Sequence, residues 1–256
     1  MNKCPYLILQ CEDTLEGILT AIYEGFTEKN KRADYQDGDI CIAIGEVQDL
    51  FLFAETKEVK TDLDKAQKTL YSMQKKISYL AYKQVLSALC HFDKERGNAV
   101  FGFLVKGFPM GAKVMEALSD PYVMRVMELA RKVDNEAHLF KGVLRFHDVG
   151  KFLYSEIEPK CNVLPRIMEH FENRYPNEHY IIYDKKKQAA LVHPAYQQSF
   201  FVYGEEWNMD LTQYTDDFET LWKEYFSHIA IKERYNPKCQ NNLLPKWYRK
   251  HMPEFL

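Results

Sequence analysis

The spacing of apolar residues changes near residue 142, and this change constrains the fold more than any other feature of the chain. Before it, apolar side chains mostly recur every three or four residues, which predicts helices. After it, short alternating runs are separated by turn residues, which predicts strands joined by hairpins. The sequence therefore predicts an α+β protein with a helical layer, an antiparallel sheet block and a C-terminal amphipathic helix.

The first part, residues 1–142, is expected to be mainly helical. Strands are predicted at residues 6–11, 40–44 and 50–54. A helix is predicted between the first two strands, because apolar residues recur at helical spacing from Leu15 to Phe26. A long helical region is expected from residue 61, since no Pro or Gly interrupts the chain before Gly97. Further helices are expected over residues 100–107, 109–118 and 121–142.

The second part, residues 143–205, reads as two strands, a helix and then two or three more strands. The strands are predicted at 143–147, 152–158, 180–183, 189–193 and 199–203, with the helix at 162–175. Residues 206–256 are expected to hold a helix that starts near Thr215 and is stopped by Pro237, followed by a basic tail. The three parts are expected to form a single domain over 1–256.

Charge is distributed unevenly along a chain whose net charge is only −3. Residues 1–60 carry 12 Asp and Glu against 6 Lys and Arg, a net of −6. Residues 232–256 carry 6 Lys and Arg against 2 Glu, a net of +4. A local basic patch is what phosphate binding requires. The alternative is a solvated, charged tail without a ligand.

Several common functions leave no motif in this sequence. Neither phosphate-binding glycine loops nor hydrolase or metalloprotease motifs are present. The six cysteines show no metal-ligand spacing, so we expect no metal site and no cofactor. No apolar run approaches the length of a membrane helix. We therefore expect a cytoplasmic protein with reduced cysteines and no contact with a membrane.

The first candidate site lies where a predicted helix meets a strand and contains Glu136, His138 and Arg145. A histidine can transfer protons near neutral pH, and Arg145 can bind a phosphate. These three residues are the catalytic candidates. The alternative is structural, because Glu136 can pair with Lys132 and His138 with Asp134, each four residues earlier on the helix.

The second candidate site is a segment in which basic and aromatic residues alternate. Cations can hold phosphates while rings stack on bases, which suits single-stranded or flipped nucleotides. The candidate nucleic-acid-binding residues are Lys141, Arg145, Arg234, Asn236, Lys238, Gln240, Lys246, Trp247, Tyr248 and Arg249. The alternative is that the aromatic side chains pack against the core and the charged groups point into water.

Weaker candidates are spread over the second part of the chain. His147, His170 and His193 fall in three separate predicted elements. Tyr154, Glu156 and Glu158 share one face of a predicted strand, where two carboxylates can support acid–base chemistry. An exposed strand face is the simpler interpretation of that pattern.

The order of these motifs resembles a bacterial family of unknown function whose members are described as DNA repair or DNA metabolism proteins. The resemblance is carried by Glu-x-His-x-Phe-x-Gly-x-x-Arg-Phe at 136–146, Arg174-Tyr175-Pro176, Leu221-Trp222 and Glu233-Arg234-Tyr235-Asn236-Pro237. It extends back to 15–21 and so covers nearly the whole chain. The ending departs from the family's usual Pro-x-Arg-Tyr-Trp, because here Trp247 precedes Tyr248 and Arg249.

The resemblance implies a link to DNA and to a protein partner. Members of the family are thought to work with a radical S-adenosylmethionine protein that carries a helix-hairpin-helix element, and relatives are fused to domains like uracil-DNA glycosylase. Three hypotheses follow: a DNA repair factor that binds nucleic acid, an adaptor for the radical S-adenosylmethionine enzyme, or an enzyme acting on a damaged base or nucleotide. Any iron–sulfur chemistry would belong to the partner, since no cluster spacing is visible here.

Overall fold

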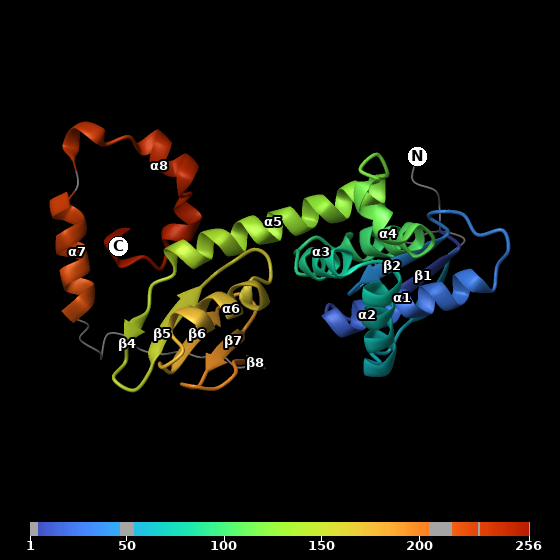
Figure 1. The fold of residues 1–256 in the computed structure, drawn as a ribbon, viewed down its shortest axis with the longest axis horizontal. Coiled ribbons are helices and arrows are strands. Elements are labelled where there is room, and N and C mark those ends of the chain that lie inside the picture. Colours follow the sequence, from blue (N-terminus) through green and yellow to red (C-terminus); the bar gives the residue numbers. More distant parts are fainter. Residues whose placement is uncertain (1–4, 47–53, 205–216, 230, 256) are drawn as a thin grey trace. The chain divides into compact units, whose positions relative to one another are not determined.

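The computed structural model describes residues 5–46, 54–229 except 205–216, and 231–255. The chain separates into two compact units, Met1–Val133 and Asp134–Leu256. Each unit contains its own β-sheet. The mixture of helices and sheets confirms the α+β class that the sequence predicts (Figure 1).

The first unit is built on three parallel strands, β1 (Leu7–Cys11), β2 (Ile40–Ile44) and β3 (Glu55–Glu58), in the order β2-β1-β3. The central strand β1 is almost entirely buried, whereas all four residues of β3 are exposed. Of the three predicted strands in this part, 6–11 and 40–44 are confirmed. The third, 50–54, falls almost wholly outside the described residues, and the sequence pattern did not predict the polar strand β3.

Helices α1 (Leu15–Asn30) and α4 (Arg96–Met110) pack on this sheet, and the other helices of the unit pack on them or on one another: α2 (Leu63–Lys76), α3 (Tyr79–Leu89) and the 3₁₀ helix η1 (Gly111–Glu116). The helical region predicted from residue 61 is confirmed, although the expectation that nothing interrupts it before Gly97 is wrong. The helix is interrupted at Ile77 and Ser78, where the Ser78 side chain accepts a hydrogen bond from the backbone N–H of Ala81 and begins a new helix. The predicted boundary at Pro109 is also wrong, since this residue lies in the last turn of α4.

The prediction of a helix over 121–142 is confirmed by α5 (Pro121–Val143). Its start is marked by Asp120, whose carboxylate accepts hydrogen bonds from the backbone N–H groups of Tyr122 and Val123. Pro121 occupies a first-turn position at which its missing N–H costs no hydrogen bond. The last residues of α5 belong to the second unit and position the candidate site.

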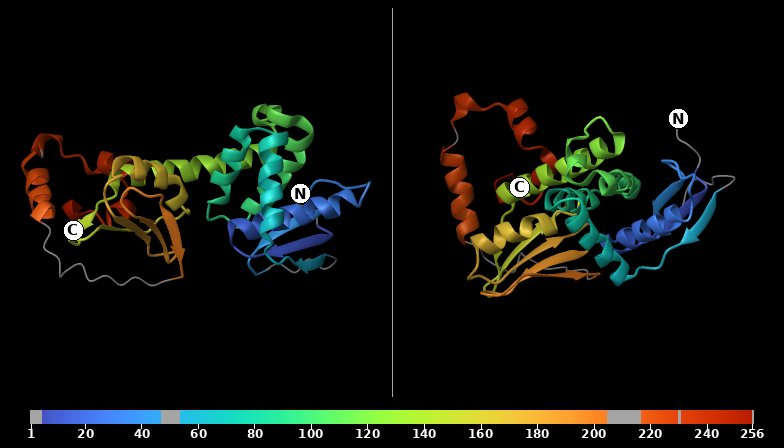
Figure 2. Two further views of the ribbon diagram at one scale, coloured as in Figure 1. Left: turned by 60° about the horizontal axis from the view of Figure 1, so that its bottom comes forward. Right: turned by 45° about the vertical axis from the view of Figure 1, so that its right-hand side comes forward.

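The second unit contains a five-stranded sheet in the order β4-β5-β6-β7-β8. Its strands are β4 (His147–Asp148), β5 (Leu153–Ile157), β6 (Tyr180–Asp184), β7 (Ala189–His193) and β8 (Phe200–Tyr203). The predicted hairpin pairings are confirmed, but the strand predicted at 143–147 is wrong, because α5 extends to Val143 and the strand comprises only His147–Asp148. Strands β5 and β6 run parallel because helix α6 (Leu164–Arg174) connects them. Figure 2 shows α6 over one face of the sheet, and its apolar residues Leu164, Ile167 and Phe171 are buried.

The C-terminal part consists of α7 (Asp217–Ile229), η3 (Lys232–Arg234), α8 (Pro237–Leu243), η4 (Lys246–Arg249) and η5 (Pro253–Phe255). The prediction that Pro237 stops the last helix is wrong. Helix α7 ends at Ile229, and Pro237 is the first residue of α8, where a proline ring is tolerated. No described helix of the chain is long and apolar enough to cross a membrane.

Candidate nucleic-acid interface

Arg145 follows α5 directly and joins that helix to the end of the chain. Its guanidinium forms an ion pair with Glu254 at 2.8 Å, although the Glu254 side chain is only 2% exposed. The same guanidinium lies 5.4 Å from the centre of the Trp222 ring and donates to the backbone oxygen of Gly142. Among the described residues, the Nε–H of Arg145 has no hydrogen-bond partner. Arg145 therefore holds Glu254 close to the end of α5, and its Nε–H makes no hydrogen bond within the described residues.

Glu136 has a structural role that the sequence alternative did not identify. This buried carboxylate accepts hydrogen bonds from the backbone N–H groups of Lys160 and Cys161, at 2.9 and 2.8 Å. These bonds hold the loop between β5 and α6. Lys132, the partner expected for Glu136, instead bonds Glu128 at 2.6 Å.

His138 and Lys141 lie on the last turns of α5, with His138 exposed and Lys141 half-buried. Asp134, the partner suggested for His138, is bonded by Arg166 at 2.8 and 3.0 Å. Burial lowers the pKa of His170 on α6, and the nearby positive charges of Lys141 and Arg174 lower it further. The three catalytic candidates therefore do not converge, since Arg145 alone of the three lines the pocket described below.

Trp247 is the candidate whose geometry best suits stacking. Its indole N–H donates to the backbone oxygen of Glu158 at 2.9 Å, while 37% of the residue stays exposed. The ammonium groups of Lys250 and Lys160 lie 4.3 and 5.8 Å from the ring centre. The ring is thus fixed at its polar edge and accompanied by two cations.

Tyr248 and Arg249 support the segment from within. The Tyr248 ring packs edge-on against Phe140 at 5.3 Å, and burial raises the pKa of its hydroxyl to about 12. Arg249 donates to the backbone oxygen of Leu244 at 2.8 and 3.0 Å and lies over the Phe255 ring. Both residues position the segment, as the packing alternative expected for this tail.

The remaining candidates divide into one cap and several exposed groups. Asn236 caps the N-terminus of α8, because its side chain accepts a hydrogen bond from the backbone N–H of Cys239 at 3.0 Å. The other side chains make no ion pair or side-chain hydrogen bond within the described part of the chain and are exposed: Arg234, Lys238, Gln240 and Lys246. These groups remain available to a ligand.

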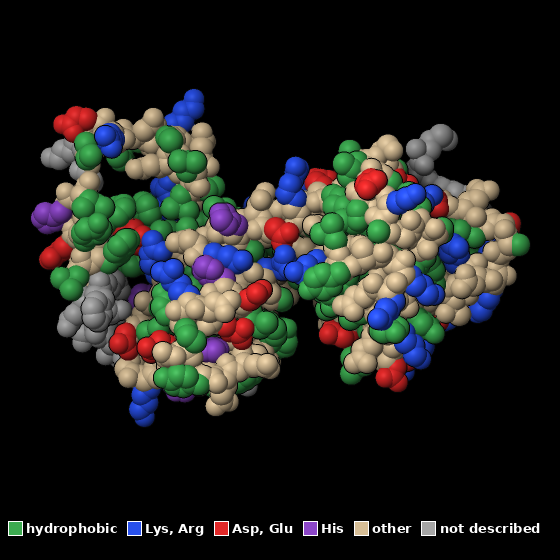
Figure 3. All heavy atoms as spheres, in the orientation of Figure 1, with side chains coloured by type: hydrophobic (Ala, Val, Ile, Leu, Met, Phe, Trp, Pro, Cys, Tyr) green, Lys and Arg blue, Asp and Glu red, His purple; other side chains and the backbone are tan. Residues whose placement is uncertain are grey.

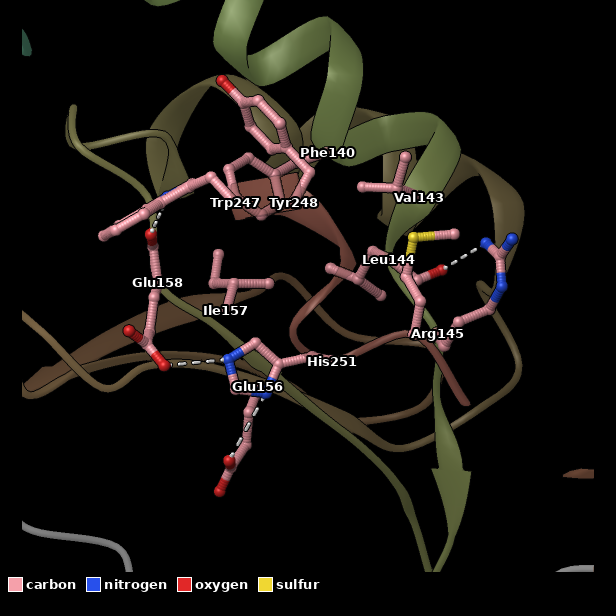
Figure 4. A pocket seen from close by; sticks show the side chains of 11 residues that line it. Phe140, Val143, Leu144, Arg145, Glu156, Ile157, Glu158, Trp247, Tyr248 and His251 are labelled. Atoms are coloured by element: carbon pink, nitrogen blue, oxygen red, sulfur yellow. Dashed lines mark hydrogen bonds and ion pairs between the residues drawn. The ribbon is translucent and has the colours of Figure 1, made fainter. Parts of the chain in front are cut away.

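His251 is a site residue that the sequence interpretation missed. Its Nε2 lies 3.1 Å from a Glu158 oxygen, and its Nδ1 lies 3.9 Å from a Glu156 oxygen (Figure 4). Lys250 also bonds Glu158 at 2.8 Å, and this hydrogen bond lowers the pKa of that carboxyl. The alternation of Tyr154, Glu156 and Glu158 was the available signal. The interpretation of this alternation as an exposed strand face is wrong, because Tyr154 is fully buried and the two carboxylates are partly covered.

A small pocket lies among these groups and encloses about 10 Å³, close to the space of one water molecule. It is lined by Phe140, Val143, Leu144, Arg145, Glu156, Ile157, Glu158, Trp247, Tyr248, His251 and Met252. Figure 4 shows Arg145 at one end, the Trp247 ring at the other and His251 between the two carboxylates. The pocket is therefore lined mainly by apolar side chains, with a cation, Arg145, and two carboxylates, Glu156 and Glu158, at different places on its wall.

The surface around the pocket has a mixed character. Figure 3 shows Lys and Arg side chains interspersed with apolar surface over the second unit.

No group of three or more His, Cys, Asp or Glu within the described ranges is arranged to hold a metal ion. His193, one of the scattered histidines, is buried, stacks on Tyr180 and lies 3.1 Å from the Ser199 hydroxyl.

These features define an α+β protein whose second unit carries a basic and aromatic C-terminal segment. The chain belongs to DUF4130, a family named as a domain of unknown function, whose model matches residues 94–254 and thus more than half of the chain. No curated protein matches the sequence. The matched range contains every candidate residue discussed above, so these features lie in the family's shared part.

Proposed function

We propose that this protein is a DNA repair or DNA metabolism factor that binds DNA through the C-terminal segment of its second unit. The observation that carries the proposal is Trp247, whose partly exposed ring is held by a hydrogen bond to Glu158 and flanked by Lys160 and Lys250. A fixed ring saves the entropy of ordering it when a base stacks. The Lys160 ammonium is then positioned to contact a phosphate, whereas Lys250 keeps its ion pair with Glu158.

The exposed cations extend this surface along the chain. Arg234, Lys238 and Lys246 have no ion-pair partner among the residues that the structure describes, so binding a phosphate breaks no ion pair of theirs. Arg145 has a different role, because its pair with Glu254 anchors the segment. We therefore assign Arg145 to positioning and the three exposed cations to DNA contact.

Fluorescence anisotropy with labelled single-stranded and duplex DNA at low salt tests the proposal. The variant Arg234→Ala/Lys238→Ala/Lys246→Ala should weaken binding at least tenfold, since each phosphate contact contributes to an affinity that depends on salt. The matched control Lys68→Ala/Lys94→Ala/Lys113→Ala removes the same charge from exposed positions of the first unit and should bind normally. Absence of binding to either DNA, or equal losses in both variants, would refute the proposal.

The partner implied by the resemblance, a radical S-adenosylmethionine protein with a helix-hairpin-helix element, belongs to the same proposal. The adaptor alternative relied on the acidic character of residues 1–60. Several of these carboxylates are neutralised within the first unit: Glu24 pairs with Lys65, Glu28 with Lys31 and Asp37 with Lys106. This pairing leaves less negative charge for a basic partner. Co-purification with that partner in the absence of any DNA binding would favour the adaptor.

A second candidate function, an enzyme acting on a damaged base or nucleotide, is favoured by His251 and its two carboxylates. A histidine bonded to Glu158 on one side and close to Glu156 on the other has the arrangement of a proton-transfer group. His251 and Trp247 both line the small pocket, so a base stacked on the exposed part of that ring would lie near this histidine. His251→Asn should abolish any base release or strand cleavage while leaving DNA affinity within about twofold. Turnover that survives this change would remove His251 from the chemistry.

A further inference from the structure

Helix α7 exposes the face that an amphipathic helix normally buries. Five apolar side chains at helical spacing lie between 37% and 58% exposed: Leu221, Trp222, Tyr225, Phe226 and Ile229. In a folded protein such a stripe is expected to face the core. A contiguous exposed apolar surface of this kind marks a binding site.

Two contacts orient α7 and cover part of two of these side chains, leaving the rest of the stripe exposed. Phe226 packs edge-on against Phe255 with ring centres 5.7 Å apart, and Trp222 lies over the Arg145 guanidinium. Trp222 and Tyr225, three residues apart and so neighbours on the helix surface, have ring centres 5.9 Å apart and an interplanar angle of 34°. The helix therefore presents two neighbouring rings on one exposed face.

The chemistry around the rings favours one kind of ligand. Arg145, itself paired with Glu254, lies against Trp222. Beyond the helix, Tyr235 is 72% exposed and adjoins Arg234, which makes no ion pair with any residue that the structure describes. Rings interleaved with guanidinium groups fit nucleobases joined by phosphates. Trp247, with Lys160 and Lys250, repeats this combination elsewhere in the same unit.

We propose that α7 is a stacking platform for unpaired bases, and that the nucleic acid bound by this protein is therefore single-stranded. The inference rests on the proposed function and names its substrate class. Each base of a duplex is already covered on both faces by its neighbours, so exposed rings gain little from a duplex. A single strand offers free base faces to Trp222 and Tyr225 while its phosphates meet the cations.

Tryptophan fluorescence tests the platform directly. The chain has three tryptophans, so Trp207→Phe with Trp247→Phe leaves Trp222 as the only indole and keeps a ring at both other positions. This protein is titrated with a single strand of about 16 nucleotides, the matching duplex, and a strand of abasic sites with the same number of phosphates. We expect the single strand alone to quench Trp222, because quenching requires a base on the ring.

A pair of variants in the full chain provides the second readout. Trp222→Leu keeps an apolar side chain but removes the ring, and should weaken single-strand binding about tenfold. Leu221→Ala on the same exposed face removes apolar area without removing a ring, and should leave affinity within about twofold. Duplex affinity should be the same in both variants, since it does not depend on the platform.

The outcomes separate this inference from the proposed function. Equal affinity for single strand and duplex without quenching of Trp222 would overturn the platform and leave DNA binding intact. Equal single-strand affinities of Trp222→Leu and Leu221→Ala would also overturn it, since a ring that stacks on no base contributes no more than an apolar side chain. If none of the three nucleic acids binds at low salt, the proposed function fails together with the platform.

Discussion

Among single residues, Glu136 shows how a catalytic candidate can be a structural group. Its spacing from His138 and Arg145 suggested chemistry, but its carboxylate is saturated by two backbone N–H groups of the loop that precedes α6. The bonding partners, Lys160 and Cys161, lie 24 and 25 residues away in sequence. No local pattern reports such a contact, so the sequence identified the residue but could not identify its role.

Glu136→Gln should destabilise the protein by about 1–3 kcal/mol. The amide replaces one carboxylate oxygen by an NH₂ donor, which then faces a backbone N–H in a buried site. Urea unfolding followed by circular dichroism measures the change. Glu169→Gln, at an exposed position on α6, is the matched control and should stay within about 0.5 kcal/mol of the parent. Equal stability of the two variants would show that Glu136 does not hold the loop.

The Glu158 carboxyl gives a pH dependence whose sign follows from its contacts. The hydrogen bond from Lys250 lowers the pKa of Glu158 in the folded chain. Its stabilising contribution is therefore complete above the unfolded pKa, about 4.3, and is lost as pH falls through the lower folded pKa.

Glu158→Gln should accordingly be less stable than the parent near neutral pH and should approach it as the pH falls below about 4. Urea midpoints measured from about pH 7 to about pH 3 provide the comparison. Glu169→Gln again serves as the control, with no such convergence expected. A difference between parent and Glu158→Gln that stays constant across this range would show that the pair with Lys250 does not stabilise the fold.

At the scale of elements, the sequence predicted the helices and strands that carry their own start and turn residues. It missed the features that depend on pairing with strands far away in the sequence. Helix α5 has a proline in its first turn, and the strands β6 and β7 are joined by a short polar turn, so their bounds were close to the prediction. Strand β3 is polar and exposed, and only its pairing with β1 makes it a strand. The parallel pairing of β5 and β6 depends on where the chain re-enters the sheet after α6.

The break between α2 and α3 leads to a prediction at the same scale. Ser78 accepts a hydrogen bond from the Ala81 N–H at 3.0 Å, and its removal leaves that N–H without its cap. Ser78→Ala should therefore cost about 1 kcal/mol of unfolding free energy, measured by urea denaturation. Ser72→Ala, inside α2, should be neutral or slightly stabilising because alanine favours a helix interior. If Ser78→Ala behaved like Ser72→Ala, the cap would not define the break.

At the scale of the whole molecule, net charge is a poor guide to ligand binding. The chain has a net charge of −3, yet residues 234–246 of the second unit carry exposed cations that make no ion pair within the described part of the chain. Charge asymmetry along the sequence predicted a basic patch in this segment. It could not separate Arg249, which bonds a backbone oxygen of its own segment, from Arg234, which remains exposed. That distinction depends on the local fold of the tail.

The three exposed cations make a quantitative prediction for salt dependence. Each phosphate neutralised on a single strand contributes about 0.7 to the slope of log affinity against log salt. If Arg234, Lys238 and Lys246 each contact one phosphate, their combined replacement by alanine should reduce the magnitude of that slope by about 2. Anisotropy titrations from about 50 to about 200 mM salt measure both slopes. An unchanged slope with reduced affinity would mean that these residues act through the local folding of the segment and not through phosphates. Arg249→Ala, by contrast, should lower affinity mainly by that indirect route, with little change in the slope.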